Sequence, residues 1–252
     1  MAADPREAIA GLRWWHVIEL APGVLTPGAW DLRPTAELMP WPASLSGARC
    51  LDIGTMDGFW AFELERRGAA EVVAIDVGET DHARLKWRPG PVPRRPDLGD
   101  TFRLAADLLG SRAEYRELDV YDLDPDEIGE FDVVVMGFVL QMLRDPLRGL
   151  EAVRSVCRGH LILVDTVSRP LSLLPSPLAR LDARRDGREF FVFNPRGMRK
   201  ALELSGFEVE ATTRMFRDTY APPPEPVSLS TRLMHGLGTR GFSVAARARR
   251  RL

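Results

Sequence analysis

The chain has 252 residues with 34 basic and 36 acidic side chains, a length typical of one compact domain or of one domain with a sub-domain. Its composition, 45% hydrophobic and 28% charged, excludes a wholly disordered or fibrous protein. The longest apolar run is Val133 to Leu140, far short of the roughly 20 residues that a membrane-spanning helix needs. Because the sequence opens without a basic-then-apolar signal region, we expect no membrane partner and a cytoplasmic location.

Arginine dominates the basic side chains, since Lys86 and Lys200 are the only lysines and 32 arginines remain. Arginine binds phosphate bidentately, which raises the question of a nucleic-acid partner. The net charge of -2 lacks the basic excess of nucleic-acid binders, so we favour the usage of a GC-rich genome. The compact clusters, Arg184 to Arg188 and Arg247 to Arg251, are interpreted mainly as solvated faces, with an anionic substrate at the first as the alternative.

The first 47 residues are dotted with proline and hold four of the six tryptophans. They are predicted to form a separate N-terminal lid over the main domain, which is expected to span 48–252. That domain begins with an apolar strand over 49–54, followed by a glycine-containing turn. An amphipathic helix over 59–67 and a β-branched strand over 71–77 come next. Strand, turn, helix and strand in this order predict a βαβ unit with a parallel sheet.

Further along the chain, four prolines make 89–96 irregular. The remaining predicted elements are helices over 100–110, 145–158 and 195–205, and strands over 114–120, 131–138, 160–167, 207–215 and 242–249. Unalternating apolar strands such as 131–138 are covered on both faces. The fold class is therefore α/β, a Rossmann-like sheet of seven mostly parallel strands. Residues 169–194 are an insertion, which we expect to cover the substrate.

The sharpest motif is Asp52-Ile53-Gly54-Thr55-Met56-Asp57-Gly58, at the end of the first predicted strand of this domain. Glycine at such a turn lets the backbone approach a ligand, and the acid Asp76 at the end of the next strand suits a ribose diol. A nicotinamide fingerprint would have glycine where Met56 and Phe59 stand. The Asp52 carboxylate would repel a pyrophosphate but could meet a cationic group. Adenosine with a charged amino-acid tail fits both requirements.

These residues resemble the first motif of the class I methyltransferases, (D/E)xGxGxG, whose cofactor is S-adenosylmethionine (SAM). The match keeps Asp52, Gly54 and Gly58 and replaces the middle glycine with Met56. The alternative is a glycine turn that serves another nucleotide or none. The resemblance implies cofactor-binding roles for Trp30, Asp52, Gly54, Thr55, Gly58, Asp76, Val77, Asp119, Val120, Met136 and Gly137.

Two of these assignments have structural alternatives. The resemblance implies adenine contacts at Asp119 and Val120, although an acidic loop is often merely solvated. It also places Met136 and Gly137 beside the sulfonium, where core packing would equally explain the methionine.

A narrower resemblance, to the tRNA wobble-uridine carboxymethyltransferase family and its uncharacterised homologues, rests on MGFVLQMLRDPLRGL, on FVFNP and on the tryptophan-rich lead-in. It implies that Trp30 helps to enclose the cofactor. That family's Tyr-His pair is Gln141-Met142 here, and no lysine precedes Lys86. Arg13 or Arg33 could replace the basic groups that a carboxylated SAM needs, but plain SAM is favoured.

Methyl transfer is an in-line displacement, so positioning supplies most of the catalysis and a general base is optional. His16 is the candidate base and Gln141 the candidate for orienting the acceptor; a structural histidine is the alternative for the former. Cys50 and Cys157 stand alone, and no Cys/His pair has metal-ligand spacing, so no metal is expected. We predict a SAM-dependent methyltransferase acting on an oxygen or nitrogen of a small molecule. The alternatives are tRNA wobble-uridine (carboxy)methylation and a non-catalytic SAM-fold binding protein.

Overall fold

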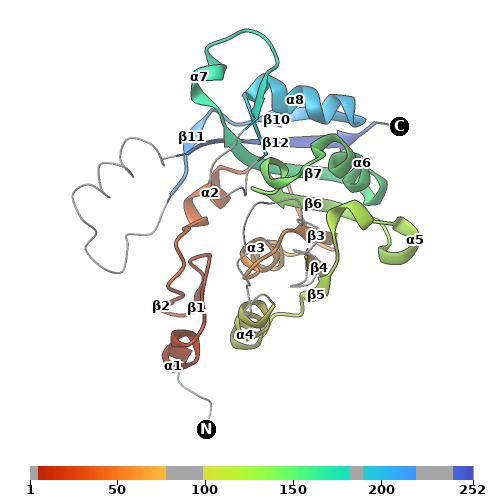
Figure 1. The fold of residues 1–252 in the computed structure, drawn as a ribbon. Helices are drawn as coiled ribbons and strands as arrows, with labels where there is room; N and C mark the ends of the chain where they lie inside the picture. Colours follow the sequence, from red (N-terminus) through yellow and green to blue (C-terminus); the bar gives the residue numbers. More distant parts are fainter. Residues whose placement is uncertain (1–4, 78–98, 182–189, 220–240, 252) are drawn as a thin grey trace, which may run out of the picture.

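The computed structural model describes residues 5–77, 99–181, 190–219 and 241–251. Its centre is a sheet in the order β10-β12-β7-β6-β3-β4-β5 (Figure 1). The strands are β3 (Arg49–Ile53), β4 (Glu71–Asp76), β5 (Glu114–Glu117), β6 (Phe131–Gly137), β7 (Cys157–Val167), β10 (Phe207–Thr212) and β12 (Phe242–Arg250). β3 to β7 run parallel, whereas β12 is antiparallel to both β7 and β10. The predicted sheet of seven mostly parallel strands is confirmed.

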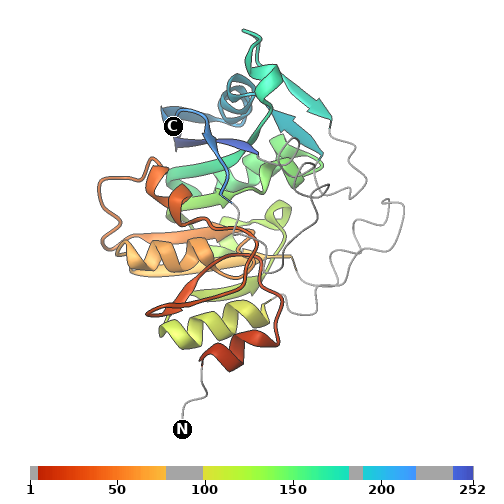
Figure 2. The same cartoon turned by 90° about the vertical axis from the view of Figure 1, so that its left-hand side faces the viewer.

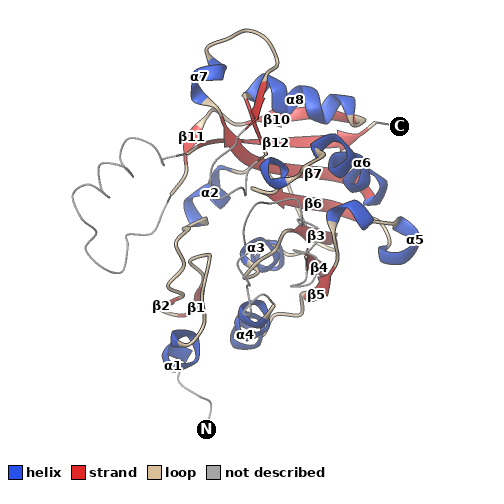
Figure 3. Ribbon diagram, viewed as in Figure 1, coloured by secondary structure: helices blue, strands red, loops and turns tan. Residues whose placement is uncertain are grey.

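Helices cover both faces of this sheet (Figure 3). α6 (Pro146–Val156) and α8 (Pro195–Leu204) pack on one face, and α3 (Phe59–Arg66) and α4 (Asp100–Leu109) pack on the other. β6 shows why its sequence is uniformly apolar: Val134 and Met136 enter the first core, while Val133 and Val135 enter the second. Burial on both faces removes the polar alternation that a one-sided strand would show.

The connections place a ligand crevice at a definite point. From β3 the chain passes to β4 and β5 on one side, then returns to β6 on the other side of β3. In open α/β sheets, ligands bind beyond the carboxyl ends of the strands at such a reversal. The ends of β3, β4 and β6 are therefore where a site is expected.

The lead-in contains elements that the sequence did not reveal: α1 (Pro5–Ala10), the hairpin β1 (Glu19–Ala21) and β2 (Val24–Leu25), and α2 (Arg33–Leu38). They lie along the α3 and α4 side of the sheet (Figure 2). Ile9, Trp14 and Leu20 enter the same hydrophobic cluster as residues of α3 and α4. The lead-in thus shares its core with the main domain.

Three predicted strand boundaries differ from the structure by three residues. β10 ends at Thr212 rather than at residue 215. β5 ends at Glu117 because the Asp119 carboxylate accepts from the Tyr121 amide at 3.0 Å and caps a short 3-10 helix over 120–122. β7 begins at Cys157, three residues before the predicted start. The four-residue helix α5 (Pro125–Ile128) and the short strand β11 (Phe216–Arg217), which pairs with β12, were also unpredicted. The predicted irregular stretch at 89–96 lies outside the described residues.

The insertion after β7 contains α7 (Arg169–Ser172), β8 (Ala179–Leu181) and β9 (Phe191–Phe193), with β9 pairing with both β8 and β7. The fully buried Asn194 side chain holds this segment together. Its Oδ1 accepts from the amides of Leu178 and Gly197 at 3.0 and 2.7 Å, and its Nδ2 donates to the carbonyls of Leu171 and Ser176 at 3.0 and 2.9 Å. The same side chain caps α8.

Asn194→Ala should lower the free energy of unfolding by about 3 kcal/mol, because several buried backbone groups lose their partners. Asn194→Ser is the matched variant, since serine can still cap α8 but cannot donate to both carbonyls. Urea denaturation should rank the stabilities as wild type, then serine, then alanine. Equal stabilities for the two variants would mean that only the cap matters.

Arginines of β12 are engaged in ion pairs. Arg247 lies 3.2 Å from Glu210, Arg250 lies 3.1 Å from Glu130, and Arg249 lies 3.7 Å from Glu208. These pairs agree with a solvated outer face rather than an RNA-binding tail. Across the part of the chain that the structure describes, no helix has the length and apolar character to cross a bilayer.

Candidate active site

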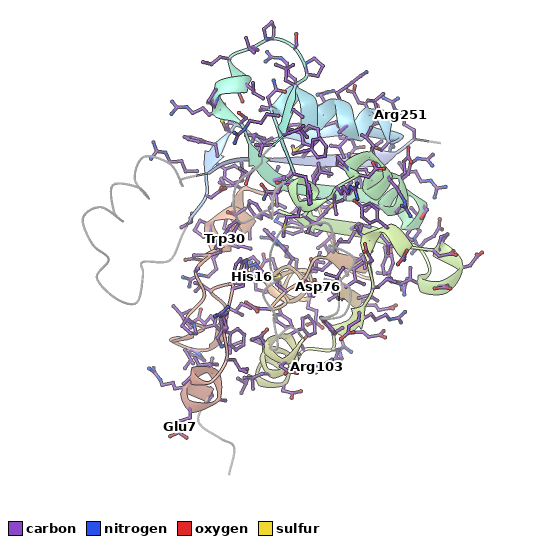
Figure 4. All side chains as sticks on the ribbon, viewed as in Figure 1. Glu7, His16, Trp30, Asp76, Arg103 and Arg251 are labelled. Carbon is purple, nitrogen blue, oxygen red and sulfur yellow. The ribbon has the colours of Figure 1, made fainter. Side chains whose placement is uncertain are left out.

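Most of the predicted site residues lie at the carboxyl ends of β3, β4 and β6, whereas Asp119 and Val120 follow β5. Figure 4 shows His16 and Trp30 of the lead-in close to one another, with Asp76 at the sheet. The loop 54–58 leads from β3 into α3. The lead-in therefore contacts the strand ends where the topology predicts a site, through His16 at Asp57 and through Trp30 at Phe138.

Gly54 forms the first turn of this loop. Its φ is +73°, and its amide and that of Thr55 both donate to the Ile75 carbonyl, at 2.9 and 3.0 Å. A Cβ at position 54 would lie 2.4 Å from Cγ2 of Val139. Glycine is thus needed both for the left-handed backbone and for the close approach of the loop after β6.

Gly54→Ala should destabilise the protein by about 2 kcal/mol more than Gly47→Ala, because only the first adds a steric clash to the backbone strain. Gly47 is a matched control: its φ is +76°, and nothing lies within 4 Å of a Cβ built there. Thermal unfolding of both variants measures the difference. Equal losses would show that Val139 moves aside freely.

Asp76 is held at the end of β4 by two backbone amides. The Met56 amide donates to Oδ2 at 2.8 Å, and the Val77 amide donates to Oδ1 at 2.8 Å. Met56 achieves this with a φ of +53°, a left-handed conformation that its family counterpart, glycine, adopts without strain.

Asp52 is fully buried beneath the loop. Its Oδ2 accepts from the Ala61 amide in the first turn of α3, at 3.1 Å, whereas Oδ1 and the nearby Thr55 hydroxyl have no hydrogen-bond partner. Burial raises the pKa of Asp52 to about 7; the charge of Asp76 adds to the rise, and the hydrogen bond from the Ala61 amide opposes it. An acid with an unsatisfied oxygen beside a glycine turn fits a ligand that carries a cationic amine.

Asp57, the acid of the loop, has a connecting role that the sequence did not reveal. It accepts hydrogen bonds from the backbone amides of Trp15 and His16 and from the Thr101 hydroxyl. Spacing gave no signal for it, because its partners lie more than 40 residues away. The next residue, Gly58, has a φ of +95°, and a Cβ there would strike the ring of Phe62 at 2.4 Å.

The remaining predicted cofactor positions divide into two groups. Gly137 packs against α3, because a Cβ there would come within 2.3 Å of the indole nitrogen of the buried Trp60. Val120 and Met136 pack in the core beneath α6.

Phe138, directly after β6, has a φ of +60°, and its ring meets that of Trp30 edge-on, with 5.1 Å between the ring centroids.

His16 is buried between the lead-in and the loop. Its Nδ1 has no hydrogen-bond partner and lies 4.0 Å from Oδ2 of Asp57. Burial lowers the pKa of His16, and Asp57 only partly opposes this. The imidazole is therefore neutral at pH 7 and retains a proton-accepting nitrogen.

Gln141 follows β6 in a 3-10 helix over 140–142. Its backbone amide donates to the carboxylate of Asp165 in β7 at 3.1 Å, and its backbone carbonyl accepts from the backbone amide of Phe190 in the insertion at 2.7 Å. Its side-chain oxygen is buried without a partner. Of the two arginines considered for a carboxylated cofactor, Arg33 is paired with Asp31 at 2.8 Å, and Arg13 is exposed. Arg184 to Arg188 lie outside the described residues.

The described residues contain no group of three or more His, Cys, Asp or Glu side chains that could hold a metal ion. The two cysteines are buried and free, and burial raises the pKa of each thiol to about 12. Neither thiol therefore resembles a reactive nucleophile.

Residues 31–212 match the family model described as a methyltransferase domain. The chain belongs to this methyltransferase family. It is a SAM-dependent methyltransferase with the class I fold, as the first motif predicted. The loop 54–58, the acid Asp76 and the buried Asp52 are the structural features that fit the cofactor.

Named relatives of this methyltransferase include ubiquinone biosynthesis O-methyltransferases. That of Marinobacter nauticus is 27% identical over 264 aligned positions, which cover 93% of each chain. That of Xanthomonas euvesicatoria is 29% identical over 159 residues, which are 62% of this chain and 57% of the relative. The specific likeness to tRNA wobble-uridine enzymes has no counterpart among these relatives.

Solved structures share the methyltransferase fold at low sequence identity. The Burkholderia thailandensis 1,6-didemethyltoxoflavin-N1-methyltransferase, determined with its substrate and S-adenosylhomocysteine, is 16% identical with a TM-score of 0.53 and covers 88% of this chain and 78% of its own. A putative methyltransferase from Bacillus halodurans is 17% identical with a TM-score of 0.56, covering 88% and 99%. At such identities these likenesses concern the fold alone.

Proposed function

We propose that this methyltransferase acts on a hydroxyl oxygen of a small aromatic molecule. The observation that carries the proposal is the aromatic wall that Trp30 and Phe138 form at the end of β6. Relatives named O-methyltransferases support oxygen as the acceptor. A nitrogen acceptor on a small molecule is the nearest alternative.

On the cofactor side, Asp76 would accept hydrogen bonds from the ribose hydroxyls, and Asp52 would face the cationic amino-acid tail. Gly54, Thr55 and Gly58 would provide the backbone surface, with Val77, Asp119 and Val120 toward the adenine and with Met136 and Gly137 toward the sulfonium. SAM supplies an activated methyl group on a sulfonium that leaves as a neutral thioether. The chain's own task is to align the acceptor and to exclude water.

Trp30, which the family resemblance assigns to the cofactor, would here face the acceptor as well, and together with Phe138 it would bind the ring of the substrate by edge-to-face and stacking contacts. The unpartnered Gln141 oxygen would accept a hydrogen bond from a second polar group of the substrate and so orient it. His16, neutral and with a free Nδ1, would take the hydroxyl proton. Residues 1–47 would serve as a lid, and residues 169–194 would cover the substrate. The protein would work in the cytoplasm.

Methylation of a tRNA wobble uridine is the second candidate. The FVFNP segment on which the resemblance to that family rests, Phe191 to Pro195, joins β9 to α8. The ion-paired arginines of β12 speak against a large basic surface.

A labelling experiment tests both candidates. The enzyme and methyl-labelled SAM are incubated separately with a small-molecule extract and with total tRNA. We expect label on the oxygen of a small aromatic compound. Label on tRNA, with affinity that falls steeply as salt rises, would replace the proposal with the second candidate. Label on a nitrogen would correct the acceptor atom only.

A further inference from the structure

The carboxylate of Asp57 connects the cofactor loop to two distant segments. Its Oδ2 accepts from the backbone amides of Trp15 at 2.5 Å and His16 at 2.7 Å. Its Oδ1 accepts from the hydroxyl of Thr101, at the start of α4, at 2.8 Å. One buried side chain thus joins the lead-in, the loop and α4.

Residue 57 cannot move independently of the loop. Met56 and Gly58 flank it with φ values of +53° and +95°. Met56 is bound to Asp76 through its amide at 2.8 Å, and the Gly58 amide donates to the Thr55 carbonyl at 2.8 Å. A ligand that restrains this loop therefore also restrains the Asp57 carboxylate.

The contacts continue from Asp57 to the acceptor side. The Trp30 amide donates to the Trp15 carbonyl at 3.0 Å, and the Val17 amide donates to the Trp30 carbonyl at 2.8 Å. The Trp30 ring then packs on Phe138 beyond β6. An unbroken series of direct contacts runs from the cofactor loop to the aromatic wall.

We propose that Asp57 is a positioning residue that couples occupancy of the cofactor loop to the order of the lead-in, and through it to the placement of Trp30. The inference rests on the proposed placement of the cofactor at residues 54–58 and of the lead-in as a lid. A ligand that narrows the motion of the loop leaves less freedom for the segment bound to its carboxylate. The coupling is reciprocal, so an ordered lead-in also strengthens cofactor binding.

Three variants separate this role from general stability. Asp57→Ala removes all three hydrogen bonds. Thr101→Ala, the matched control, removes the hydrogen bond between Asp57 and α4 and leaves the lead-in attached. Asp57→Asn is the conservative variant, because its carbonyl oxygen can still accept from Trp15 and His16. Asp57→Ser, whose side chain is too short to hold both amides, replaces the alanine variant if that one does not fold.

Hydrogen exchange of the Trp15, His16 and Trp30 amides, with and without saturating S-adenosylhomocysteine, tests the coupling. In the wild type, Thr101→Ala and Asp57→Asn, we expect the ligand to slow exchange about tenfold. In Asp57→Ala the ligand should still bind, but exchange in the lead-in should no longer respond. A full response in Asp57→Ala, or no response in the liganded wild type, would overturn the coupling. Failure of the wild type to bind the ligand, measured by calorimetry, would instead remove the cofactor placement.

Discussion

Asp76→Ala is expected to weaken the binding of S-adenosylhomocysteine about 100-fold, because hydrogen bonds to a charged acceptor contribute about 1.5–3 kcal/mol each. The wild-type carboxylate is held in place by the amides of Met56 and Val77. The same carboxylate would accept hydrogen bonds from the ribose hydroxyls. The alanine variant loses these acceptors and also releases the Met56 turn.

Titration calorimetry measures the effect, and circular dichroism establishes that the variant is folded. Glu71→Ala is the control, since Glu71 stands at the opposite end of the same strand and pairs with Arg49 on the surface. Its affinity should equal that of the wild type. An unchanged affinity in folded Asp76→Ala would exclude Asp76 from the ribose site.

Asp52 should make the protein less stable as the pH rises from 4 to 7. Its pKa is raised by burial from an ordinary 3.8 to about 7. Between these values the folded state binds more protons than the unfolded state, so stability falls with increasing pH. The protonated Asp52 contributes about 4 kcal/mol to the free energy of unfolding through this shift. The contribution is fully present below the pKa of the unfolded state and is lost as the pH rises through the pKa of the folded state.

Asp52→Asn isolates this effect because an amide does not titrate and its oxygen can still accept from the Ala61 amide. Relative to the wild type, the variant should gain about 4 kcal/mol of stability between pH 4 and pH 8. Urea denaturation at both pH values gives the difference. A stability gap that stays constant with pH would mean that the folded pKa of Asp52 is ordinary. The variant should also bind S-adenosylhomocysteine more weakly, since it lacks a charge to face the amine.

The sheet and its main helices could be predicted because their signals are local. Val133 to Met136 are apolar without alternation. Gly54 marks a turn between the apolar strand before it and the helix after it, and the acid Asp76 ends the strand that follows that helix. The proposed cofactor side rests on the same short stretch, since Asp52, Gly54 and Asp76 stand at or next to the ends of neighbouring strands.

The lead-in and the insertion were less predictable. β1, β2, β8, β9 and β11 have two or three residues each, too few to show a period. Their stability comes from contacts with distant segments, such as the Asn194 side chain that binds the carbonyl of Leu171, 23 residues away.

The amino-acid sequence alone determined the α/β class, the cofactor motif and the absence of a basic excess, because each depends on composition or on residues close together in the chain. The tertiary structure decided that the lead-in shares the core of the domain, that β12 inserts between β7 and β10, and that Asp57 joins three segments. These features are hydrogen bonds and packing between residues far apart in the chain. No local pattern encodes such contacts, because their formation depends on the whole fold.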